Sequence, residues 1–209
     1  MQTGSLMSVM TSTEHLPDVR SQRPKRADAR RNYDKLVAAA LEAFTEEGGS
    51  ASLEEIARRA GVGIGTLYRN FPTRQDLLEA VYVEEVEAVC QTAEELMSEP
   101  PWEGLVAWLH RFLDYLATKQ ALSAELFDHL DRDAAVFRGC RTAFYGAGEH
   151  LLVRAQQDGV VRTDVSIDDV VLLVAGISKM PAADEGQIPR ILDIALQGLR
   201  IPSAPTVAN

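Results

Sequence analysis

Polar side chains of the kinds that bind phosphate follow one another in the second quarter of the 209-residue chain. Thr66 and Tyr68 provide hydroxyl groups. Guanidinium and amide groups follow on Arg69, Asn70 and Arg74. Proteins direct such groups at the phosphate oxygens of nucleic acids, and the free N–H groups at the start of a short helix near Thr66 add to them. The sequence shows no nucleophile paired with a base, no phosphate-binding loop and no metal-ligand cluster. These residues therefore indicate binding rather than catalysis.

Two short helices and a tight turn are predicted to position these side chains. Ser52 and Glu55 fit a capping box, in which the serine hydroxyl accepts the backbone N–H of Glu55 and the glutamate reaches back to the cap. Gly61 follows where the chain must turn sharply, which suits a residue without a Cβ atom. Between them, apolar residues recur at helical spacing at Leu53, Ile56, Ala57 and Ala60.

The second of these helices is predicted from about Ile64 to Asn70. Leu67 and Phe71, four residues apart, would face the core, and a proline then ends the helix. Thr73 and Asp76 fit a capping box at the start of a third, long helix. A helix of about seven residues is not stable alone, so tertiary packing must hold it in place.

This layout is that of a helix-turn-helix, and the string resembles the DNA-binding domain of the tetracycline-repressor (TetR) family. The matching motifs are AALEAFTEEGG, SLEEIARRAGV, GTLYRNFPTR and QDLLEAV, and the resemblance is specific over residues 30–82 and general beyond. It implies that Tyr68 and Arg74 contact phosphates and that positions 63–66 read base edges. Taken by itself, Tyr68 is equally a half-buried packing residue, and it can serve both purposes.

Two positions depart from the family pattern. Gly63 stands where the family often has serine or threonine, and Ile64 stands where a polar or basic residue is frequent. Glycine gives up a side-chain cap at a cost of only about a few tenths of a kcal/mol. Isoleucine cannot hydrogen-bond to a base edge, but it can pack on a thymine methyl group. The predicted specificity therefore depends on Thr66, on DNA shape and on the basic arm that precedes the motif.

A basic arm precedes the helix-turn-helix. The chain has a net charge of −10, but residues 1–76 contain 11 Lys/Arg and 10 Asp/Glu, whereas residues 77–209 contain 10 and 21. Residues 20–31 hold six of these cations against a single acid, so we expect an arm that tracks phosphates or enters the minor groove. A solvated charged tail is the alternative. The predicted interface with a double-stranded DNA operator comprises Arg23, Lys25, Arg26, Ser52, Gly63, Ile64, Gly65, Thr66, Tyr68, Arg69, Asn70 and Arg74.

The rest of the chain shows helical periodicity and no strand alternation, which predicts an all-α fold. We expect a helix-turn-helix domain at residues 22–76 and a helical ligand-binding and dimerisation domain at 77–200, between tails at 1–21 and 201–209. The long helix that joins them is predicted at 74–98. Further helices are predicted at residues 29–47, 102–118, 121–130, 134–157, 167–180 and from about 189 to 200.

The resemblance also implies a homodimer formed by the last two long helices and a small-molecule pocket in each subunit. The run VVLLVAGIS is apolar on every face, and Ala175 and Gly176 would allow two helices to approach closely; burial in the core explains the run nearly as well. A pocket needs apolar walls and a few polar tips, although most aromatic stripes of this kind are core. The pocket is predicted at Trp108, Phe112, Tyr115, Phe127, His129, Phe144 and Tyr145.

These observations predict a ligand-released repressor that uses no cofactor. Alternatives are a DNA-binding dimer controlled by a protein partner or by nothing, and, more distantly, an all-α enzyme. His110 and Asp114 share a helical face, but spacing places no third ligand beside them, so we expect no metal site.

No segment is apolar for the about 18 residues that a membrane span needs. Cys90 and Cys140 are expected to be reduced thiols in a cytoplasmic, nucleoid-associated bacterial protein.

Overall fold

The computed structural model describes residues 23–24, 26–129, 135–184 and 186–201, with the backbone alone at 121–129 and 135–136. The described chain is helical apart from its connections and one isolated bridge between Val161 and Arg200, which confirms the predicted all-α fold. The helices are α1 (Ala27–Glu47), α2 (Leu53–Arg59), α3 (Ile64–Asn70), α4 (Arg74–Leu96), α5 (Pro101–His129), α6 (Ala135–Gln157), α7 (Ile167–Ile177) and α8 (Gln187–Leu196), with single 3-10 turns η2 (Gly48–Ser50) and η3 (Gln197–Leu199).

The predicted break between residues 118 and 121 is wrong. The segments 102–118 and 121–130 were expected to be separate helices, but they form the single helix α5, which begins at Pro101. Proline is favoured in the first turn of a helix because its missing N–H has no partner there. Lys119 and Gln120 lie between the two segments, and both are strong helix formers, so nothing interrupts the backbone hydrogen bonds. The result is a 29-residue helix that packs against α4 and α6 and also contacts α1 and η2.

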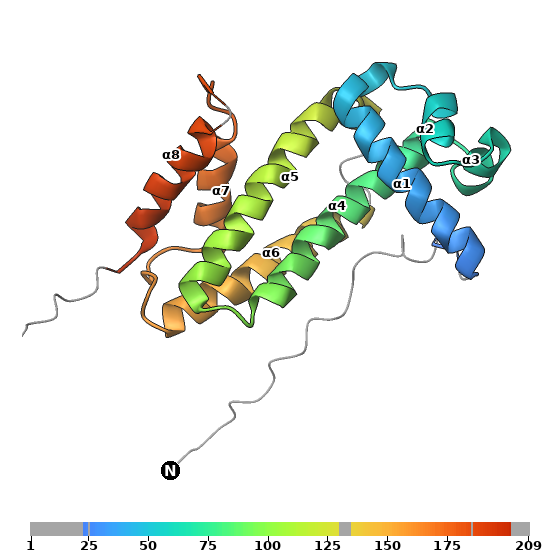
Figure 1. The fold of residues 1–209 in the computed structure, drawn as a ribbon. Helices are drawn as coiled ribbons and strands as arrows, with labels where there is room; N and C mark the ends of the chain where they lie inside the picture. Colours follow the sequence, from blue (N-terminus) through green and yellow to red (C-terminus); the bar gives the residue numbers. More distant parts are fainter. Residues whose placement is uncertain (1–22, 25, 130–134, 185, 202–209) are drawn as a thin grey trace, which may run out of the picture.

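The described residues form two hydrophobic cores, and α4 contributes to both. The first core, which we call the head, contains buried residues from Tyr33 to Val81, contributed by α1, α2, α3 and the first turns of α4. The second, which we call the body, contains buried residues from Val83 to Leu199. The head lies at one end of α4, and α7 and α8 lie beside α5, away from the head (Figure 1). With 23 residues, α4 is about 34 Å long and joins the two cores as one rod.

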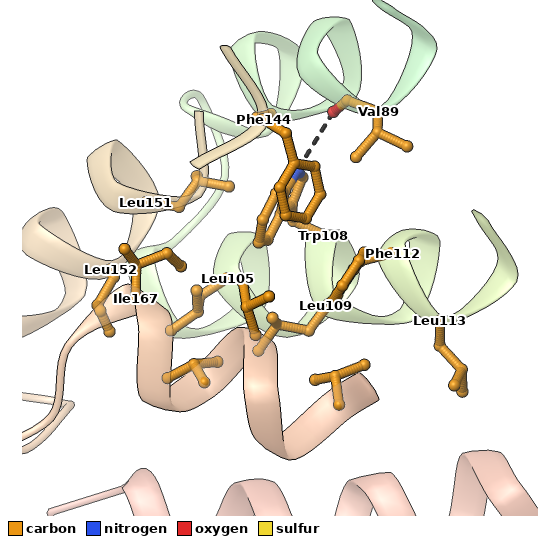
Figure 2. Packing of buried hydrophobic residues seen from close by; sticks show 14 of the residues in the cluster. Val89, Leu105, Trp108, Leu109, Phe112, Leu113, Phe144, Leu151, Leu152 and Ile167 are labelled. Carbon is orange, nitrogen blue, oxygen red and sulfur yellow. Dashed lines mark hydrogen bonds between the residues drawn. The ribbon is translucent and has the colours of Figure 1, made fainter. Parts of the chain in front are cut away.

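Trp108 lies at the centre of the body (Figure 2). Its indole N–H donates a hydrogen bond to the Val89 carbonyl on α4 at 3.1 Å, and its ring packs against Phe144 of α6 with centroids 5.2 Å apart. Gly148 of α6 allows this close approach, because a Cβ atom there would lie 2.4 Å from the edge of the indole. A single glycine therefore sets how closely α6 packs on α5.

Candidate nucleic-acid interface and ligand cavity

At the start of α2, only one of the two hydrogen bonds of the predicted capping box forms. The Ser52 hydroxyl accepts the backbone N–H of Glu55 at 3.1 Å, as predicted. The reciprocal half of the predicted capping box is absent, because the Glu55 carboxylate instead accepts hydrogen bonds from Arg58 and Arg59 at 2.6 to 2.9 Å. These bonds lower the pKa of Glu55 to about 2. Two guanidinium groups one turn away bind a carboxylate more strongly than a neutral backbone N–H does.

The turn between α2 and α3 depends on Gly61. Its φ is 68°, in the left-handed region that a side chain makes unfavourable. The Gly61 and Val62 N–H groups donate to the carbonyls of Arg58 and Ala57 at 3.1 and 3.0 Å, which satisfies the end of α2. The prediction of a sharp glycine turn is confirmed, and it fixes the direction in which α3 leaves α2.

The helix α3 has the predicted bounds, Ile64 to Asn70. Leu67 is its single fully buried side chain, and Phe71, just beyond its end, packs its ring against Tyr33 of α1 with centroids 4.9 Å apart. On the outer face, Ile64 is 38% exposed and Tyr68 is 47% exposed. Gly63, Gly65 and Arg69 are also exposed. The positions expected to read base edges therefore share one open surface with the Tyr68 hydroxyl.

The polar side chains at the end of α3 also contact the helix itself. Arg69 donates to the Gly65 carbonyl at 3.1 Å and to the Thr66 hydroxyl at 2.9 Å. Asn70 donates to the Thr66 carbonyl at 2.8 Å. These bonds hold the side chains close to the helix, so the exposed edge near Thr66 presents little besides glycine, isoleucine and one hydroxyl.

Arg74 is the first residue of α4. Besides carrying a positive charge, it contacts other elements of the head. Its guanidinium lies over the Phe44 ring at 4.8 Å and donates to the Ala51 carbonyl. The predicted capping box beside it is confirmed: the Thr73 hydroxyl accepts from the Asp76 N–H at 3.1 Å, and the Asp76 carboxylate accepts from the Thr73 N–H at 2.8 Å. Arg74 thus joins α1, the loop before α2 and the start of α4.

Of the six cations at residues 20–31, the structure describes Arg23 and Arg26 before α1, and Arg30 and Arg31 within α1. Arg20 and Lys25 lie outside the described residues. Arg26 is exposed directly before α1. Arg23 is part-buried and ion-paired with three acids on α1 and α4: Asp34 at 3.1 Å, Glu84 at 3.0 Å and Glu87 at 3.9 Å. The prediction placed Arg23 among the DNA contacts, but its partners here hold the arm against the rod α4.

The body encloses a cavity of about 580 Å³ between α4, α5, α6 and α7. Four of the predicted residues line it: Phe112, Tyr115, Phe144 and Tyr145. Trp108 does not, because it is fully buried against Val89 and Gly148, and the side chains of Phe127 and His129 lie outside the described part of the chain. The lining residues that were not predicted are Tyr82, Val86, Leu116, Lys119, Gln120, Phe137, Arg138, Cys140, Arg141, Val171, Ala175, Ser178 and Lys179.

Helical spacing would have found part of this set. Leu116, Lys119 and Gln120 continue the face of Phe112 along α5 in steps of three or four, and Phe137 and Arg141 do the same for Phe144 along α6. No such periodicity indicates that Tyr82 and Val86 of α4 face the same space. The Tyr82 and Tyr115 hydroxyls are hydrogen-bonded to each other, and burial raises the pKa of both tyrosines.

The two cysteines and His110 were the other candidates for reactive or metal-binding groups. Burial raises the pKa of the Cys140 thiol to about 12 and that of Cys90 to about 11, so neither forms the reactive thiolate at neutral pH. The His110 imidazole lies 2.8 Å from the Asp193 carboxylate on α8. Among the described residues, no three His, Cys, Asp or Glu side chains come together as metal ligands. In the same residues, no helix is long and apolar enough to cross a membrane.

A helix-turn-helix presented at the end of a rod by a separate helical body defines a DNA-binding transcriptional regulator. Two family models match the chain: "Bacterial regulatory proteins, tetR family" over residues 36–81, and "Transcriptional regulator SbtR-like, C-terminal domain" over residues 100–201. The chain belongs to the TetR family of bacterial transcriptional regulators.

Solved structures and curated relatives agree with this assignment. The chain is 40% identical to the TetR transcriptional regulator SCO0520 from Streptomyces coelicolor, with a TM-score of 0.73 over 82% of this chain and 99% of that one. It is 33% identical to a TetR regulatory protein from Mycobacterium vanbaalenii, with a TM-score of 0.71 over 85% and 100%. The HTH-type transcriptional regulator SAR0097 of Staphylococcus aureus is 32% identical over 46% of this chain, and the chain spans only about half (53%) of that relative's length.

Proposed function

We propose that the protein is a homodimeric repressor that leaves its operator when a small molecule enters the cavity of the body. The observation that carries this proposal is the position of Tyr82. This side chain lines the cavity and packs against both the head and the body. Its ring contacts Phe137, with centroids 4.9 Å apart, and Phe137 also lines the cavity and packs against the head.

The Tyr82 and Phe137 pair supplies a short physical route from cavity to DNA. A ligand that displaces either ring changes the packing under the first turns of α4, where Val81 and Leu78 belong to the head. Because α4 is one rod, a shift at Tyr82 reorients α3. A ligand that binds the reoriented state more tightly lowers the population that fits the operator.

On the DNA side, we infer that α3 enters the major groove. The edge formed by Gly63, Ile64 and Gly65 offers close backbone approach and one apolar contact for a thymine methyl group, and Tyr68 offers a hydroxyl to phosphate. In a dimer, two heads would meet half-sites about 34–36 Å apart, one turn of DNA. The site of action would be the bacterial cytoplasm, at the nucleoid.

The dimer proposal is supported by the outer face of α7 and α8. Leu172 is 73% exposed and Ile194 is 74% exposed, with Leu173 and Met180 exposed nearby in sequence. A monomer rarely leaves several large apolar side chains open on adjacent elements, and a two-fold axis would bury them against their own copies. Replacing Leu172 and Ile194 together by glutamate is expected to give a monomer in light scattering. Thr163→Glu, exposed in the loop before α7, is the control and should leave the dimer intact.

The experiment that tests the function begins by selecting an operator from random DNA with the purified protein. Binding to this operator is then titrated by fluorescence anisotropy at fixed salt, with and without small molecules that bind the cavity. Release by such a molecule is the expected result. If cavity ligands bind the protein but leave operator affinity unchanged, the release mechanism is wrong, and control by a protein partner becomes the better account.

A further inference from the structure

The cavity is apolar at depth. Phe112 and Phe144 pack with ring centroids 4.7 Å apart, and Tyr115 lies 6.2 and 6.3 Å from them. All three are at least 93% buried. Stacked and tilted rings of this kind form a wall that favours a flat apolar body. The volume of about 580 Å³ falls in the range that holds a small organic molecule.

The mouth of the cavity is cationic. Arg138, Arg141 and Lys179 are exposed and line it together with Lys119, which is half-buried. No aspartate or glutamate occurs among the described lining residues. Residues 77–209 contain only ten Lys/Arg against 21 Asp/Glu, so four of the ten cations of an acidic body border this one space.

Two described carboxylates of α4 have cationic partners outside the cavity lining. Glu85 is ion-paired with Arg111 at 3.6 Å, and Glu87 lies 3.9 Å from the Arg23 guanidinium. Asp168 lies with Arg141 on an adjoining surface recess rather than in the cavity lining. Lys119 is placed over the rings of Tyr82 and Tyr115, 5.8 and 5.9 Å from their centroids. Within the described lining, positive charge therefore exceeds negative charge.

We propose that the effector is an organic anion, with a flat apolar body that packs against Phe112, Tyr115 and Phe144 and an acidic group at the mouth, beside Arg141 and Lys179. This inference rests on the proposed function, because it names the chemical class of the molecule that the cavity takes. A carboxylate or sulfonate gains charge-assisted hydrogen bonds there, whereas an ammonium group would be repelled. The apolar part supplies affinity, and the acidic group supplies orientation and selects the class of ligand.

Positive charge at the mouth acts on one of the tyrosines that line the cavity. Arg141 and Tyr82 line the same cavity, and the positive charge of Arg141 opposes the rise that burial gives the pKa of Tyr82. An acidic group bound to Arg141 would therefore lie close to Tyr82. This location gives the anion a direct contact with the route that we propose for release.

The test uses three probes with one shared ring system: 2-naphthoate, 2-naphthamide and 2-naphthylmethylammonium. Calorimetric titration of the full-length, DNA-free protein at low salt should give a Kd for naphthoate at least about tenfold below that for the amide, as expected for a hydrogen bond to a charged group. The ammonium probe should bind more weakly than the amide. The advantage of naphthoate should decrease as salt rises, because the mouth is open to solvent.

Two double variants test whether the preference for naphthoate depends on the cations at the mouth of the cavity. Replacing Arg141 and Lys179 together by glutamine should bring naphthoate to within about twofold of the amide and leave the amide itself unchanged. The control replaces Arg162 and Arg190 by glutamine. These arginines are exposed in the body and outside the described lining, and their loss changes the net charge equally. The control should retain the full preference for naphthoate.

The outcomes separate this inference from the proposed function. Equal or tighter binding of the amide or the ammonium probe overturns the anion class and leaves ligand-controlled release intact. Binding of no probe overturns the cavity as a ligand site and removes the basis for release as well. Naphthoate preference without operator release, measured with the selected operator, supports the anion class and contradicts naphthoate-driven release.

Discussion

The head and the body pack their cores in different ways. In the head, alanines at positions 39, 40, 43, 57 and 60 are buried, so α1 and α2 approach closely around a few larger side chains. In the body, aromatic rings are stacked between α4, α5 and α6, and a cavity of about 580 Å³ remains beside them. Close packing suits a surface that must fit DNA, because a tightly packed interior does not deform continuously. Open space suits a part that must accept a ligand.

The first prediction concerns a substitution that destabilises the head and leaves the packing of the body unchanged. Leu67 is the single buried side chain of α3, which is too short to be stable alone. Leu67→Ala should lower the free energy of unfolding by about 3 kcal/mol and abolish operator binding. Urea unfolding and anisotropy titration measure the two effects. Leu109→Ala is the matched change in the body: it should cost a similar amount while the folded protein still binds DNA. Equal loss of DNA binding in both variants would mean that the two cores unfold as one unit.

The second prediction compares two glycines of α6. A Cβ atom at Gly148 would lie 2.4 Å from the buried Trp108 ring, whereas nothing lies within 4 Å of one at Gly146. Gly148→Ala should cost about 2 kcal/mol, because α6 must move away from α5. Gly146→Ala should be neutral or stabilise by up to about 1 kcal/mol through helix propensity. Thermal unfolding provides both values. A neutral Gly148→Ala would show that the indole can shift, and that the body is more adaptable than its packing indicates.

The same contrast explains what the sequence could predict. In the head, the bounds of α3, the turn at Gly61 and the cap at Thr73 depend on residues within four positions of one another, and each prediction is confirmed. The capping box at Ser52 is half wrong, because Glu55 had arginine partners at equally short range. Local rules predict which contacts are possible, but the strongest of several competing partners decides which one forms.

In the body, the distinction between wall and core depends on contacts between helices. Trp108 and Phe112 stand four apart on one face of α5, and the sequence pattern treats them alike. Gly148, 40 positions further along, lets α6 close over the first ring, while the second borders the cavity. The position of Arg23 also depends on a contact distant in sequence, because its partner Glu84 lies 61 positions away. Nothing near Arg23 in the sequence distinguishes an arm that tracks DNA from an arm that pairs with α4.

The third prediction concerns this contact between the arm and α4. Arg23→Gln should cost about 1 kcal/mol at pH 7, a value kept small because the paired side chains are partly exposed. Burial raises the pKa of Glu84, and Arg23 opposes that rise. Without Arg23 the Glu84 pKa should rise further. The ionised Glu84 destabilises the fold above that pKa, so the deficit should shrink as the pH falls and Glu84 is protonated.

Urea unfolding of both proteins between pH 8 and pH 5 measures this dependence, with the exposed Arg26→Gln as control. Operator binding adds a second readout. A salt dependence that decreases by about one unit in Arg23→Gln would identify Arg23 as a phosphate contact. An unchanged salt dependence with reduced stability would identify it as a link between arm and rod.

The last prediction concerns the outer face of α3. Tyr68→Phe keeps the ring and removes the hydroxyl, so operator affinity should fall by about fivefold, near 1 kcal/mol. Affinity for random DNA should fall by the same factor, because a phosphate contact is independent of sequence. The salt dependence should not change, since the hydroxyl has no charge. Ile64→Ala should behave in the opposite way, weakening the operator and leaving random DNA unaffected. If Tyr68→Phe instead alters the ratio of operator to random affinity, Tyr68 contacts a base, and the recognition edge extends one turn further along α3.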